Sequence, residues 1–514
     1  MPVNWMEEYD VVVAGSGGGG MSGTYTAARE GLSVLLLEAA DKFGGTTAYS
    51  GGGGMWFPCN PVLQRAGTDD TIDDALTYYR AVVGDRTPQE LQETYVRGGA
   101  PLIEYLEKDD NLAFEMLPWP DYFGKAPGAR LDGQRHTMPS PLPVSEAPEL
   151  RDIVRGPLDV DRLGASTPDD FFIGGRALVA RFLKAISAYP DATLRLNSTL
   201  VELVTEDGRV TGAIVERGGE TVAIRARKGV LLAAGGFEGN EEMRARHGVP
   251  GLARDTMGPW SNTGKAHRAG IAVGADTDLM DQAWWSPGLT HPDGRSAFAL
   301  WFTGGIFVNQ NGERFVNESA PYDRLGRAVI DQLDDGALSL PFWMIYDDTE
   351  GEIPPIKASN VSFDETEKYR AAGLWHTAET LDELATKIGV PADALVATVE
   401  RFNSMVDRGS DEDFGRGDEA YDRAFSGGEL PMAAITRGPF HAAAFGISDL
   451  GTKGGLRTDS RARVLDSAGT AIPGLYAAGN TMAAPSGTTY PGGGNPIGTS
   501  MLFSHLAVRD MVDE

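Results

Sequence analysis

Cysteine is almost absent from this chain, because Cys59 is the only one among 514 residues. An intramolecular disulfide is therefore excluded, and so is a structural metal site built from cysteines. The seven histidines are scattered and show no metal-ligand spacing such as HxxxH, so the sequence predicts no metal centre. A reducing, cytoplasmic compartment is the expected location.

Long apolar runs and an excess of positive charge are also missing. No stretch reaches the ~18 apolar residues of a membrane-spanning helix, and the opening residues MPVNWMEEYD predict no secretory signal. Acidic residues outnumber basic ones by 73 to 45, which gives a formal net charge of −28. This excess argues against nucleic acid and an anionic membrane surface as the main partner, while peripheral membrane contact stays open.

Glycine, by contrast, is abundant, with 66 residues. A chain of this length exceeds one compact core, so we expect two domains or one large domain with an insertion. Two glycine-rich stretches lie near opposite ends of the chain, VVVAGSGGGGMSG at residues 11–23 and SGTTYPGGGNPIGTSM at residues 486–501. Stretches of this kind indicate tight turns and close approaches of the backbone to another group.

The N-terminal glycines stand in a complete structural context. Residues 10–14 predict a buried strand, residues 15–20 satisfy GxGxxG, residues 21–31 predict a helix, and residues 33–38 predict a second strand that ends in Glu38. This is the βαβ dinucleotide fingerprint, in which the glycines admit a pyrophosphate to the helix N-terminus and the acid accepts ribose hydroxyls. A purely structural glycine turn is the alternative.

The segment after Glu38 favours FAD over NAD. An NAD domain would normally continue with another strand and helix, whereas residues 44–54, GGTTAYSGGGG, form a loop rich in glycine and hydroxyl groups. Such a loop suits a long cofactor that lies extended along the protein, and a flexible linker is the alternative. Residues 197–212 predict a strand, a turn and a strand, and residues 229–237 and 472–480 predict two buried strands that end on glycine.

The order of the motifs GSGGGG, GGTTAYSGG, LLAAGGF and IPGLYAAGN resembles the FAD-binding fold of the fumarate reductase/succinate dehydrogenase flavoprotein superfamily over nearly the whole chain. The resemblance implies an α/β protein. A Rossmann-like FAD-binding domain would comprise residues 1–283 and 450–514, and an α+β catalytic domain of residues 284–449 would be inserted into it. The two glycine-rich stretches would then meet at one flavin.

The same resemblance implies the residues that contact FAD, which we expect to be noncovalent because no histidine or cysteine lies in an obvious attachment motif. The residues assigned to the pyrophosphate, ribose and adenine are Gly15, Ser16, Gly17, Gly18, Gly20, Glu38 and Val201. The residues assigned to the flavin ring, its ribityl chain and their surroundings are Gly45, Thr46, Thr47, Ser50, Gly51, Gly52, Ala234, Gly235, Gly479, Asn480, Asn495, Pro496 and Ile497. A helix that starts near Ile497 would direct its N-terminus at the N1/O2 edge of the ring.

The element GERFVNESAPYD, residues 312–323, differs from its counterpart in fumarate reductases at one position. In those enzymes it reads roughly GxRFxNExxxRD, and the last arginine is the proton donor. Tyr322 stands at that position here, so a cation that a dicarboxylate site needs is replaced by a phenol. This change counts against fumarate as the substrate.

Three tyrosines indicate a closer resemblance. Tyr122 in a PDY loop, Tyr322 in NESxPYD, and Tyr490 with Gly494 in TYxGxG resemble the 3-ketosteroid Δ1-dehydrogenases. The resemblance implies FAD-dependent 1,2-desaturation of 3-ketosteroids to 1-ene or 1,4-diene-3-ones, with loss of a proton from C2 and transfer of a hydride from C1 to flavin N5. It also implies a steroid substrate and an electron acceptor that the sequence does not identify, a quinone being one candidate.

The chemistry gives each of these residues a role. Loss of the C2 proton requires that the ketone oxygen be stabilised as an enolate, and we assign the Tyr490 hydroxyl and the Gly494 N–H to that task. We assign Tyr322 as the base, on the face opposite the flavin. Because a free phenol with a pKa of about 10 is a weak base at neutral pH, we assign Tyr122 to support it.

Other functions remain open at this point. Within the superfamily, the alternatives are a 3-ketosteroid Δ4-(5α)-dehydrogenase and a fumarate reductase-type flavoprotein, and outside enzymes the alternative is a non-catalytic FAD-binding redox protein. His267 is interpreted as structural. Seven aromatic residues are candidates to line a flat apolar pocket, with core packing as the alternative for each: Trp56, Phe57, Trp119, Trp284, Trp285, Trp301 and Phe302.

Overall fold

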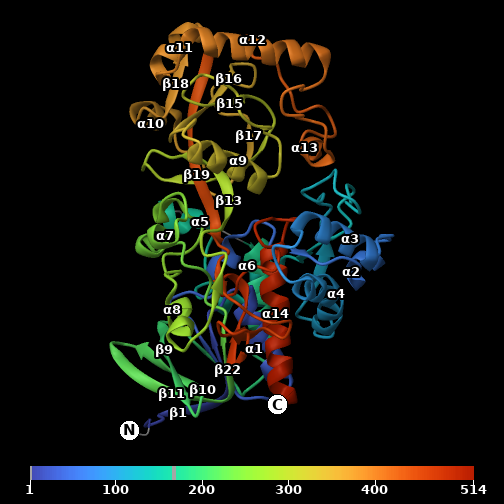
Figure 1. Ribbon diagram of the computed structural model, residues 1–514, viewed down its shortest axis with the longest axis vertical. Coiled ribbons are helices and arrows are strands. Elements are labelled where there is room, and N and C mark those ends of the chain that lie inside the picture. The colour runs from blue at the N-terminus through green and yellow to red at the C-terminus, as the bar shows by residue number, and fades with distance from the viewer. Residues whose placement is uncertain (1–2, 165–169) are drawn as a thin grey trace. The chain divides into compact units, whose positions relative to one another are not determined.

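The computed structural model describes residues 3–164 and 170–514 (Figure 1). The chain divides into two compact units, of which unit 1 comprises Met1–Val249, Gly258–Ala283 and Gly451–Glu514, and unit 2 comprises Pro250–Met257 and Trp284–Leu450. Residues 250–257 thus group with unit 2, although the sequence places them in the FAD-binding part. The reason is pairing: the Met257 N–H donates to the Asp449 carbonyl at 2.8 Å, and the Thr256 hydroxyl donates to the Asp449 carboxylate at 2.7 Å.

Unit 1 contains a sheet that has eight strands within the described residues, and its centre consists of the apolar runs that the sequence marks as buried. The parallel strands are, in order across the sheet, β22 (Ala471–Ala477), β11 (Glu220–Leu232), β1 (Glu7–Ala14), β2 (Val34–Leu37) and β8 (Ala192–Arg195). The antiparallel strands at its margins are β21 (Arg463–Leu465), β10 (Arg209–Arg217) and β9 (Ser198–Glu206). The predicted α/β class and its central βαβ unit are confirmed.

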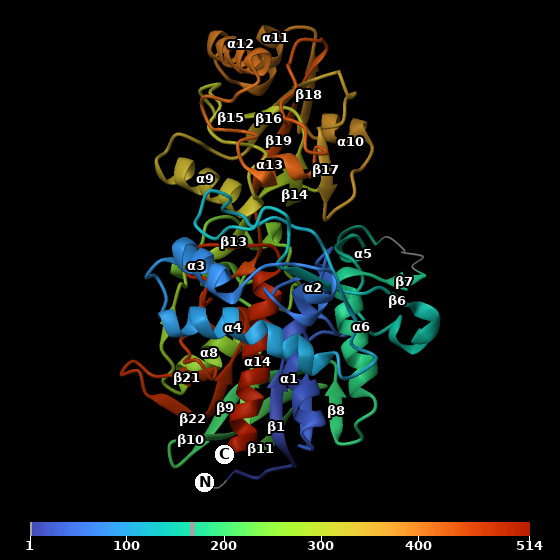
Figure 2. The same ribbon diagram turned by 90° about the vertical axis from the view of Figure 1, so that its right-hand side faces the viewer.

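Helices α1 (Gly18–Arg29) and α14 (Asn495–Asp513) lie side by side against this sheet (Figure 2). They approach closely because α1 carries small residues where they meet: a Cβ on Gly19 would lie 3.0 Å from the Ser500 carbonyl oxygen. The Ser22 hydroxyl donates to the Met501 carbonyl at 2.9 Å. The two glycine-rich stretches therefore meet, as predicted. Both helices begin a few residues earlier than expected, at Gly18 and Asn495, because the residues that directly follow each N-cap already belong to the first helical turn.

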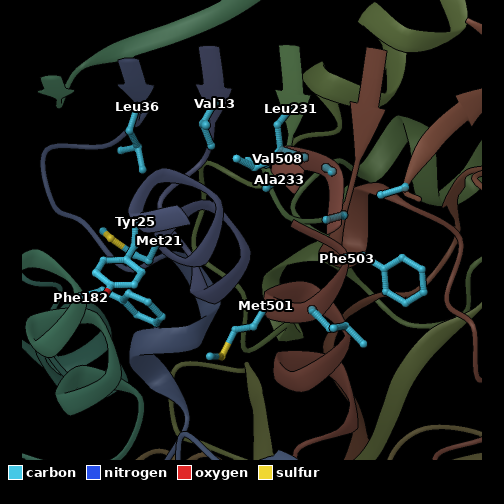
Figure 3. Close-up of a cluster of buried hydrophobic side chains, with 14 of the residues drawn as sticks. Val13, Met21, Tyr25, Leu36, Phe182, Leu231, Ala233, Met501, Phe503 and Val508 are labelled. Atoms are coloured by element: carbon cyan, nitrogen blue, oxygen red, sulfur yellow. The ribbon is translucent and has the colours of Figure 1, made fainter. Parts of the chain in front are cut away.

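The core of unit 1 joins these helices to the strands. Figure 3 shows fully or almost fully buried side chains from β1, β2, β11, α1, α14 and α6 (Gly174–Ile186), among them Val13, Leu36, Leu231, Met21, Tyr25, Phe182, Met501, Phe503 and Val508. Burying one aliphatic or aromatic side chain of this size contributes about 1.5–3 kcal/mol. This cluster holds the ends of β1 and β2 against the start of α1.

Shorter elements of unit 1 connect the parts of the sheet. Three helices follow β2 along the chain, α2 (Pro61–Arg65), α3 (Ile72–Val83) and α4 (Gln89–Leu106). A small sheet has the strand order β3 (Met55–Trp56), β5 (His136–Pro139) and β4 (Phe114–Met116). The remaining elements are β6 (Leu142–Pro143), β7 (Phe171–Phe172), α5 (Leu158–Leu163), α7 (Glu241–His247), α8 (Lys265–Ala272), β12 (Thr277–Asp278) and β20 (Gly455–Leu456).

Unit 2 is built on an antiparallel sheet for which the described residues supply seven strands. Its strands are, in order, β15 (Ile306–Val308), β16 (Phe342–Asp347), β19 (Phe440–Thr452), β13 (Ala283–Thr290), β14 (Ser296–Phe302) and β17 (Ile356–Ser359), with β18 (Trp375–Ala378) beside β19. Its helices are α9 (Tyr322–Asp334), α10 (Thr366–Ala371), α11 (Leu381–Ile388), α12 (Ala392–Arg408) and α13 (Ala420–Ala424). Phe307, Phe342 and Phe445 pack edge to face or tilted at its centre.

Candidate active site

The turn between β1 and α1 leaves no space for side chains at two of its glycines. Gly15 has a φ of +100°, and a Cβ there would lie 2.2 Å from the Ala233 carbonyl oxygen. A Cβ on Gly20 would lie 1.8 Å from the Gly15 carbonyl oxygen. The first N–H groups of a helix have no partner within that helix, and at Gly18 the N–H turns to the Thr47 hydroxyl at 2.9 Å. The turn therefore brings backbone without side chains to the start of α1, the place at which helices of this kind bind a pyrophosphate.

Glu38 lies at the end of β2 and is only 5% exposed. Its carboxylate accepts hydrogen bonds from the Ser16 N–H at 3.2 Å, the Ser16 hydroxyl at 2.5 Å and the Ala40 N–H at 2.8 Å. The Ser16 hydroxyl also accepts from the Gly44 N–H at 2.9 Å, so it ties the glycine turn to the following loop. A carboxylate oriented by backbone donors can accept ribose hydroxyls. Val201 is half-buried on β9.

The loop after β2 contains a short 3₁₀ helix, η1 (Gly45–Tyr49), which carries both threonines assigned to the flavin. The Thr46 hydroxyl accepts from Asn262 Nδ2 at 3.0 Å, and the same nitrogen donates to Glu238 Oε1 at 2.6 Å. Neither Asn262 nor Glu238 was predicted as a site residue, although both are buried. Their only sequence signal was a polar residue close to a glycine, Glu238 before Gly239 and Asn262 two residues before Gly264.

The middle of this loop, at Gly51 and Gly52, is open. The Ser50 hydroxyl accepts from the Gly53 N–H at 3.0 Å, and a Cβ on Gly51 would meet no atom of the described residues within 4 Å. Gly51 is exposed and Gly52 is half-buried. Open backbone of this kind is available to a molecule that lies along the loop.

The C-terminal part of the site is tied to the end of β11. The Ala234 N–H donates to the Thr481 hydroxyl at 3.0 Å, and that hydroxyl donates to the Gly235 carbonyl at 2.8 Å. Thr481 ends the 3₁₀ helix η5 (Gly479–Thr481). His267 Nε2 lies 3.1 Å from the Asn480 carbonyl oxygen, so it holds the middle of η5 in place. This contact supports the structural interpretation of His267.

The start of α14 combines a close backbone approach with a buried acceptor. Gly494 has a φ of +83°, and a Cβ there would lie 2.4 Å from the carbonyl carbon of Gly54. Asn495 is completely buried, its Nδ2 donates to the Tyr79 hydroxyl at 3.4 Å, and its Oδ1 has no partner among the described residues. A buried acceptor in this state suits a bound group that donates a hydrogen bond. Pro496 follows in the first turn and Ile497 lies 3.4 Å from the position of a Cβ on Gly18.

Tyr122 and Tyr490 pack against each other within unit 1. Their ring centroids are 5.2 Å apart at an interplanar angle of 40°, and both side chains are almost fully buried. The Tyr122 N–H donates to the Pro491 carbonyl at 3.1 Å. A Cβ on Gly493 would lie 3.3 Å from the Tyr122 hydroxyl oxygen, so that hydroxyl faces the backbone just before Gly494. The structure thus brings together three of the four predicted catalytic residues.

A buried ionic network supports Tyr122, and sequence reasoning missed it. Asp121 accepts from Trp56 Nε1 at 2.8 Å, from the Arg130 N–H at 2.9 Å and from Arg135 at 2.7 Å, and Arg135 also pairs with Asp70 at 2.7 Å. Burial raises the pKa of Asp121 to about 6, and Arg135 opposes this rise. The partners lie far apart along the chain, so no local pattern marks the network.

Tyr322, the fourth predicted residue, belongs to unit 2, where it is the first residue of α9 after Pro321. It is 6% exposed, and its ring meets that of Phe298 edge to face, with centroids 4.9 Å apart. The preceding loop is held by Arg416, which is fully buried and donates to the Ser319 hydroxyl at 2.9 Å and the Gly305 carbonyl at 2.6 Å. The position of Tyr322 at a helix N-terminus favours negative charge on its side chain.

The aromatic residues considered for a pocket have mainly packing partners. Trp56 is 1% exposed and stacks on Tyr95 at a centroid distance of 6.2 Å, and Phe57 packs against the same ring at 5.9 Å. In unit 2, Trp301 stacks on Phe425 at 4.3 Å. Packing within each unit therefore accounts for these three residues.

Acidification is expected to destabilise unit 1 through His267. Burial lowers the pKa of His267 from 6.5 to about 4, and its Nδ1 has no partner among the described residues. The unfolded chain binds a proton here between those two values and the folded chain does not, so stability present above pH 6.5 is lost as the pH falls toward 4. The melting temperature should drop over this range, and His267→Gln, which keeps a neutral donor, should flatten the decline. Equal slopes for variant and wild type would contradict this.

Comparison with known proteins agrees with this architecture. The protein-family model for the FAD binding domain matches residues 10–497. The 3-oxosteroid 1-dehydrogenase of Mycolicibacterium smegmatis is 36% identical, covering 98% of this chain and 97% of that protein. A crystal structure of the 3-ketosteroid Δ1-dehydrogenase of Sterolibacterium denitrificans, in complex with 1,4-androstadiene-3,17-dione, superposes with a TM-score of 0.89 at 31% identity, covering 99% of this chain and 100% of that one. The 4-oxocyclohexanecarboxylate 2-dehydrogenase of Sinomonas cyclohexanicum is 34% identical, covering 98% and 93%.

The fold and the matched domain define an FAD-binding flavoprotein oxidoreductase. Within that class, the chain belongs to the 3-oxosteroid 1-dehydrogenase family. The predicted membership of this family is thereby confirmed, and FAD is the cofactor.

Proposed function

We propose that this protein is an FAD-dependent dehydrogenase that introduces the C1–C2 double bond of 3-ketosteroids. The observation that carries the proposal is the packing of Tyr122 against Tyr490 beside the backbone that leads to Gly494. We further propose that unit 1 is the FAD-binding domain and that unit 2 is the catalytic domain inserted into it.

FAD would be held noncovalently by the backbone and side chains described above. The glycine turn before α1 would bind the pyrophosphate, Glu38 the ribose, and the loop of Thr46 and Thr47 the flavin side of the cofactor. The unpartnered Asn495 Oδ1 suits an N–H donor on the ring, and the N-terminus of α14 suits a ring that gains negative charge. When bound, FAD supplies the acceptor for the hydride that leaves C1.

Tyr490 and Gly494 would act on the ketone oxygen of the substrate. A ketone makes the neighbouring C2 proton acidic only if negative charge on its oxygen is stabilised, and a phenol hydroxyl with a backbone N–H supplies two donors. Gly494 suits this task because its φ of +83° and its contact with Gly54 exclude a side chain that would cover the N–H. Burial of Tyr490 excludes water, which strengthens its hydrogen bond.

Tyr322 would take the C2 proton. The first turn of α9 offers N–H groups that favour a phenolate, and the buried ring packing limits the orientations of the side chain. Tyr122 would support the transfer as a second phenol. Asp121, one residue earlier, holds the Tyr122 loop through Trp56 and Arg135.

A second candidate substrate is 4-oxocyclohexanecarboxylate, because a relative that is 34% identical over 98% of this chain is named for it. That compound shares with the steroid A ring a ketone in a six-membered ring, which is the part that Tyr490 and Gly494 would bind. The two compounds differ outside this ring, because 4-oxocyclohexanecarboxylate carries a carboxylate where the steroid has its other, apolar rings. Comparing kcat/KM for the two substrates separates the candidates.

The test is to mix the purified protein with 4-androstene-3,17-dione without oxygen. The visible band of oxidised flavin should bleach, and mass spectrometry should detect the 1,4-diene, because the steroid is then the only electron donor. A 3-hydroxysteroid without the ketone is the control and should leave the band unchanged. A yellow protein that 4-androstene-3,17-dione does not reduce would contradict the substrate assignment. The substrates to test next are then 5α-androstane-3,17-dione, 4-oxocyclohexanecarboxylate, and fumarate with reduced dye.

The partner that reoxidises the flavin is proposed to be a quinone-type acceptor, and the proposed location is the cytoplasm with peripheral contact to the membrane. In residues 3–164 and 170–514, no helix has the length and apolar character needed to cross a bilayer. Turnover with a soluble quinone in place of dye, measured with and without lipid vesicles, tests both points.

A further inference from the structure

The loops that carry Tyr122 and Tyr490 meet at a hydroxyl group that belongs to neither of them. Tyr78, on α3, donates from its hydroxyl to the Pro491 carbonyl at 2.5 Å. The Phe123 N–H donates to the same hydroxyl at 3.2 Å. Since Phe123 follows Tyr122 and Pro491 follows Tyr490, this one phenol is bonded to the residue next to each tyrosine.

Tyr78 is itself held firmly in this position. Its side chain is completely buried, and burial raises its pKa well above the usual value, so it keeps its proton and remains a donor. The Arg135 guanidinium lies over its ring at 5.4 Å and over the Trp56 ring at 5.6 Å. Arg135 also binds Asp121, so the ionic network beneath the Tyr122 loop fixes Tyr78 as well.

A second hydrogen bond joins the two loops directly. The Pro491 carbonyl accepts from the Tyr122 N–H at 3.1 Å as well as from Tyr78. Loss of the Tyr78 hydroxyl would leave the Phe123 N–H without this acceptor and the Pro491 carbonyl with one bond fewer. The relative position of the loops would then rest on the contacts that remain, among them the Tyr122–Pro491 bond and the packing of the Tyr122 and Tyr490 rings.

We propose that Tyr78 is a positioning residue for the desaturation, whose hydroxyl sets the Tyr490 hydroxyl relative to Tyr122. The proposal rests on the proposed function, because it requires that Tyr490 bind the ketone oxygen. Catalytic donors must be held within about 0.5 Å of their productive positions, and a displacement of about 1 Å can cost about 10²-fold in rate. A hydroxyl that bonds to both loops meets this requirement without touching the substrate.

The first experiment compares Tyr78→Phe with a matched control, Tyr25→Phe. Tyr25 is also fully buried in unit 1, but its hydroxyl donates to the carboxylate of Asp109 at 3.2 Å, a residue that belongs to neither loop. Tyr78→Phe should keep its FAD content and the KM for 4-androstene-3,17-dione, while kcat falls about 10- to 100-fold. Tyr25→Phe should keep kcat. A Tyr78→Phe enzyme with wild-type kcat would overturn the proposal.

A double-mutant cycle then distinguishes positioning from a general structural effect. If Tyr78 acts through Tyr490, adding Tyr78→Phe to Tyr490→Phe should lower kcat by less than about twofold. If Tyr490→Phe is slow and Tyr78→Phe lowers its kcat by the same factor as in the wild type, this proposal is wrong and the proposed function stands. A Tyr490→Phe enzyme with normal kcat would instead overturn the assigned role of Tyr490, and this inference with it, while a wild-type enzyme that does not desaturate the steroid would overturn the proposed function.

A second substitution keeps the proposal testable if Tyr78→Phe does not fold. Incorporation of 3-fluorotyrosine at position 78 preserves the ring and the hydroxyl but makes the hydroxyl more acidic, which changes both hydrogen bonds. We expect a change in kcat when Tyr490 is present and none in the Tyr490→Phe background. An unchanged kcat in both backgrounds would overturn the proposal.

Discussion

Tyr322→Phe is expected to lower kcat for steroid desaturation by about 10²–10⁴-fold, the range for loss of a general base. Tyr322 begins α9, is 6% exposed and packs edge to face on Phe298. Phenylalanine keeps this ring packing and removes only the oxygen to which the C2 proton would go. FAD content and melting temperature should therefore stay close to those of the wild type.

The measurement that isolates this step is exchange of the C2 proton. Steroid incubated with the enzyme in heavy water should gain deuterium at C2, detected by mass spectrometry, and Tyr322→Phe should slow this exchange as much as it slows turnover. Tyr346→Phe is the matched control in unit 2, since Tyr346 is also buried and its hydroxyl donates to the Glu352 carbonyl at 2.7 Å. If Tyr322→Phe exchanges the C2 proton as fast as the wild type does, another group removes the proton.

Tyr490→Phe should lower kcat by about 10²–10³-fold, the usual effect of removing one donor to a developing oxyanion. Tyr490 is 4% exposed and its ring packs on Tyr122, so phenylalanine fills the same space. The Gly494 N–H would remain as a single donor. Because the loss concerns the charged state more than the ground-state ketone, kcat should fall more than KM rises.

Binding of an enolate analogue tests this assignment without turnover. A steroid with a phenolic A ring presents a hydroxyl at the position of the ketone oxygen, and its affinity should fall in Tyr490→Phe. Tyr476→Phe is the control, because Tyr476 is buried in unit 1 and its hydroxyl donates to Asp510 at 3.0 Å. Unchanged affinity for the phenolic steroid together with unchanged kcat would rule out Tyr490 as the donor.

Local patterns predicted the central part of the fold well. The apolar run that ends in Ala14, the glycines after it and the strand that ends in Leu37 follow one another with short connections, so their βαβ arrangement depends on few distant contacts. Helix boundaries were less accurate, because α1 begins at Gly18 and not at Met21. A glycine lowers helix propensity, yet at the first turn packing against α14 outweighs that cost.

The support of the candidate site could not be predicted in the same way. Tyr78 and Pro491 are bonded although they lie 413 positions apart, and Asn262 and Thr46 are bonded across 216 positions. Neither pair belongs to a motif, and Tyr78 is one of 15 tyrosines, most of which pack as ordinary amphipathic side chains. Resemblance to a family pointed to the tyrosines that would react, but not to the residues that hold them.

The sequence by itself determined the fold class and the FAD-binding fingerprint, because glycine spacing, apolar runs and a terminal acid act over short distances along the chain. Its resemblance to a family indicated the candidate reactive residues. Only the tertiary structure decided that Tyr122, Tyr490 and the backbone before Gly494 lie together, that Asn495 presents an unpartnered acceptor within the described residues, and that Asp121, Arg135 and Tyr78 support the two loops. These contacts arise from the packing of α3, α14 and the intervening loops, which brings together side chains that are remote in sequence.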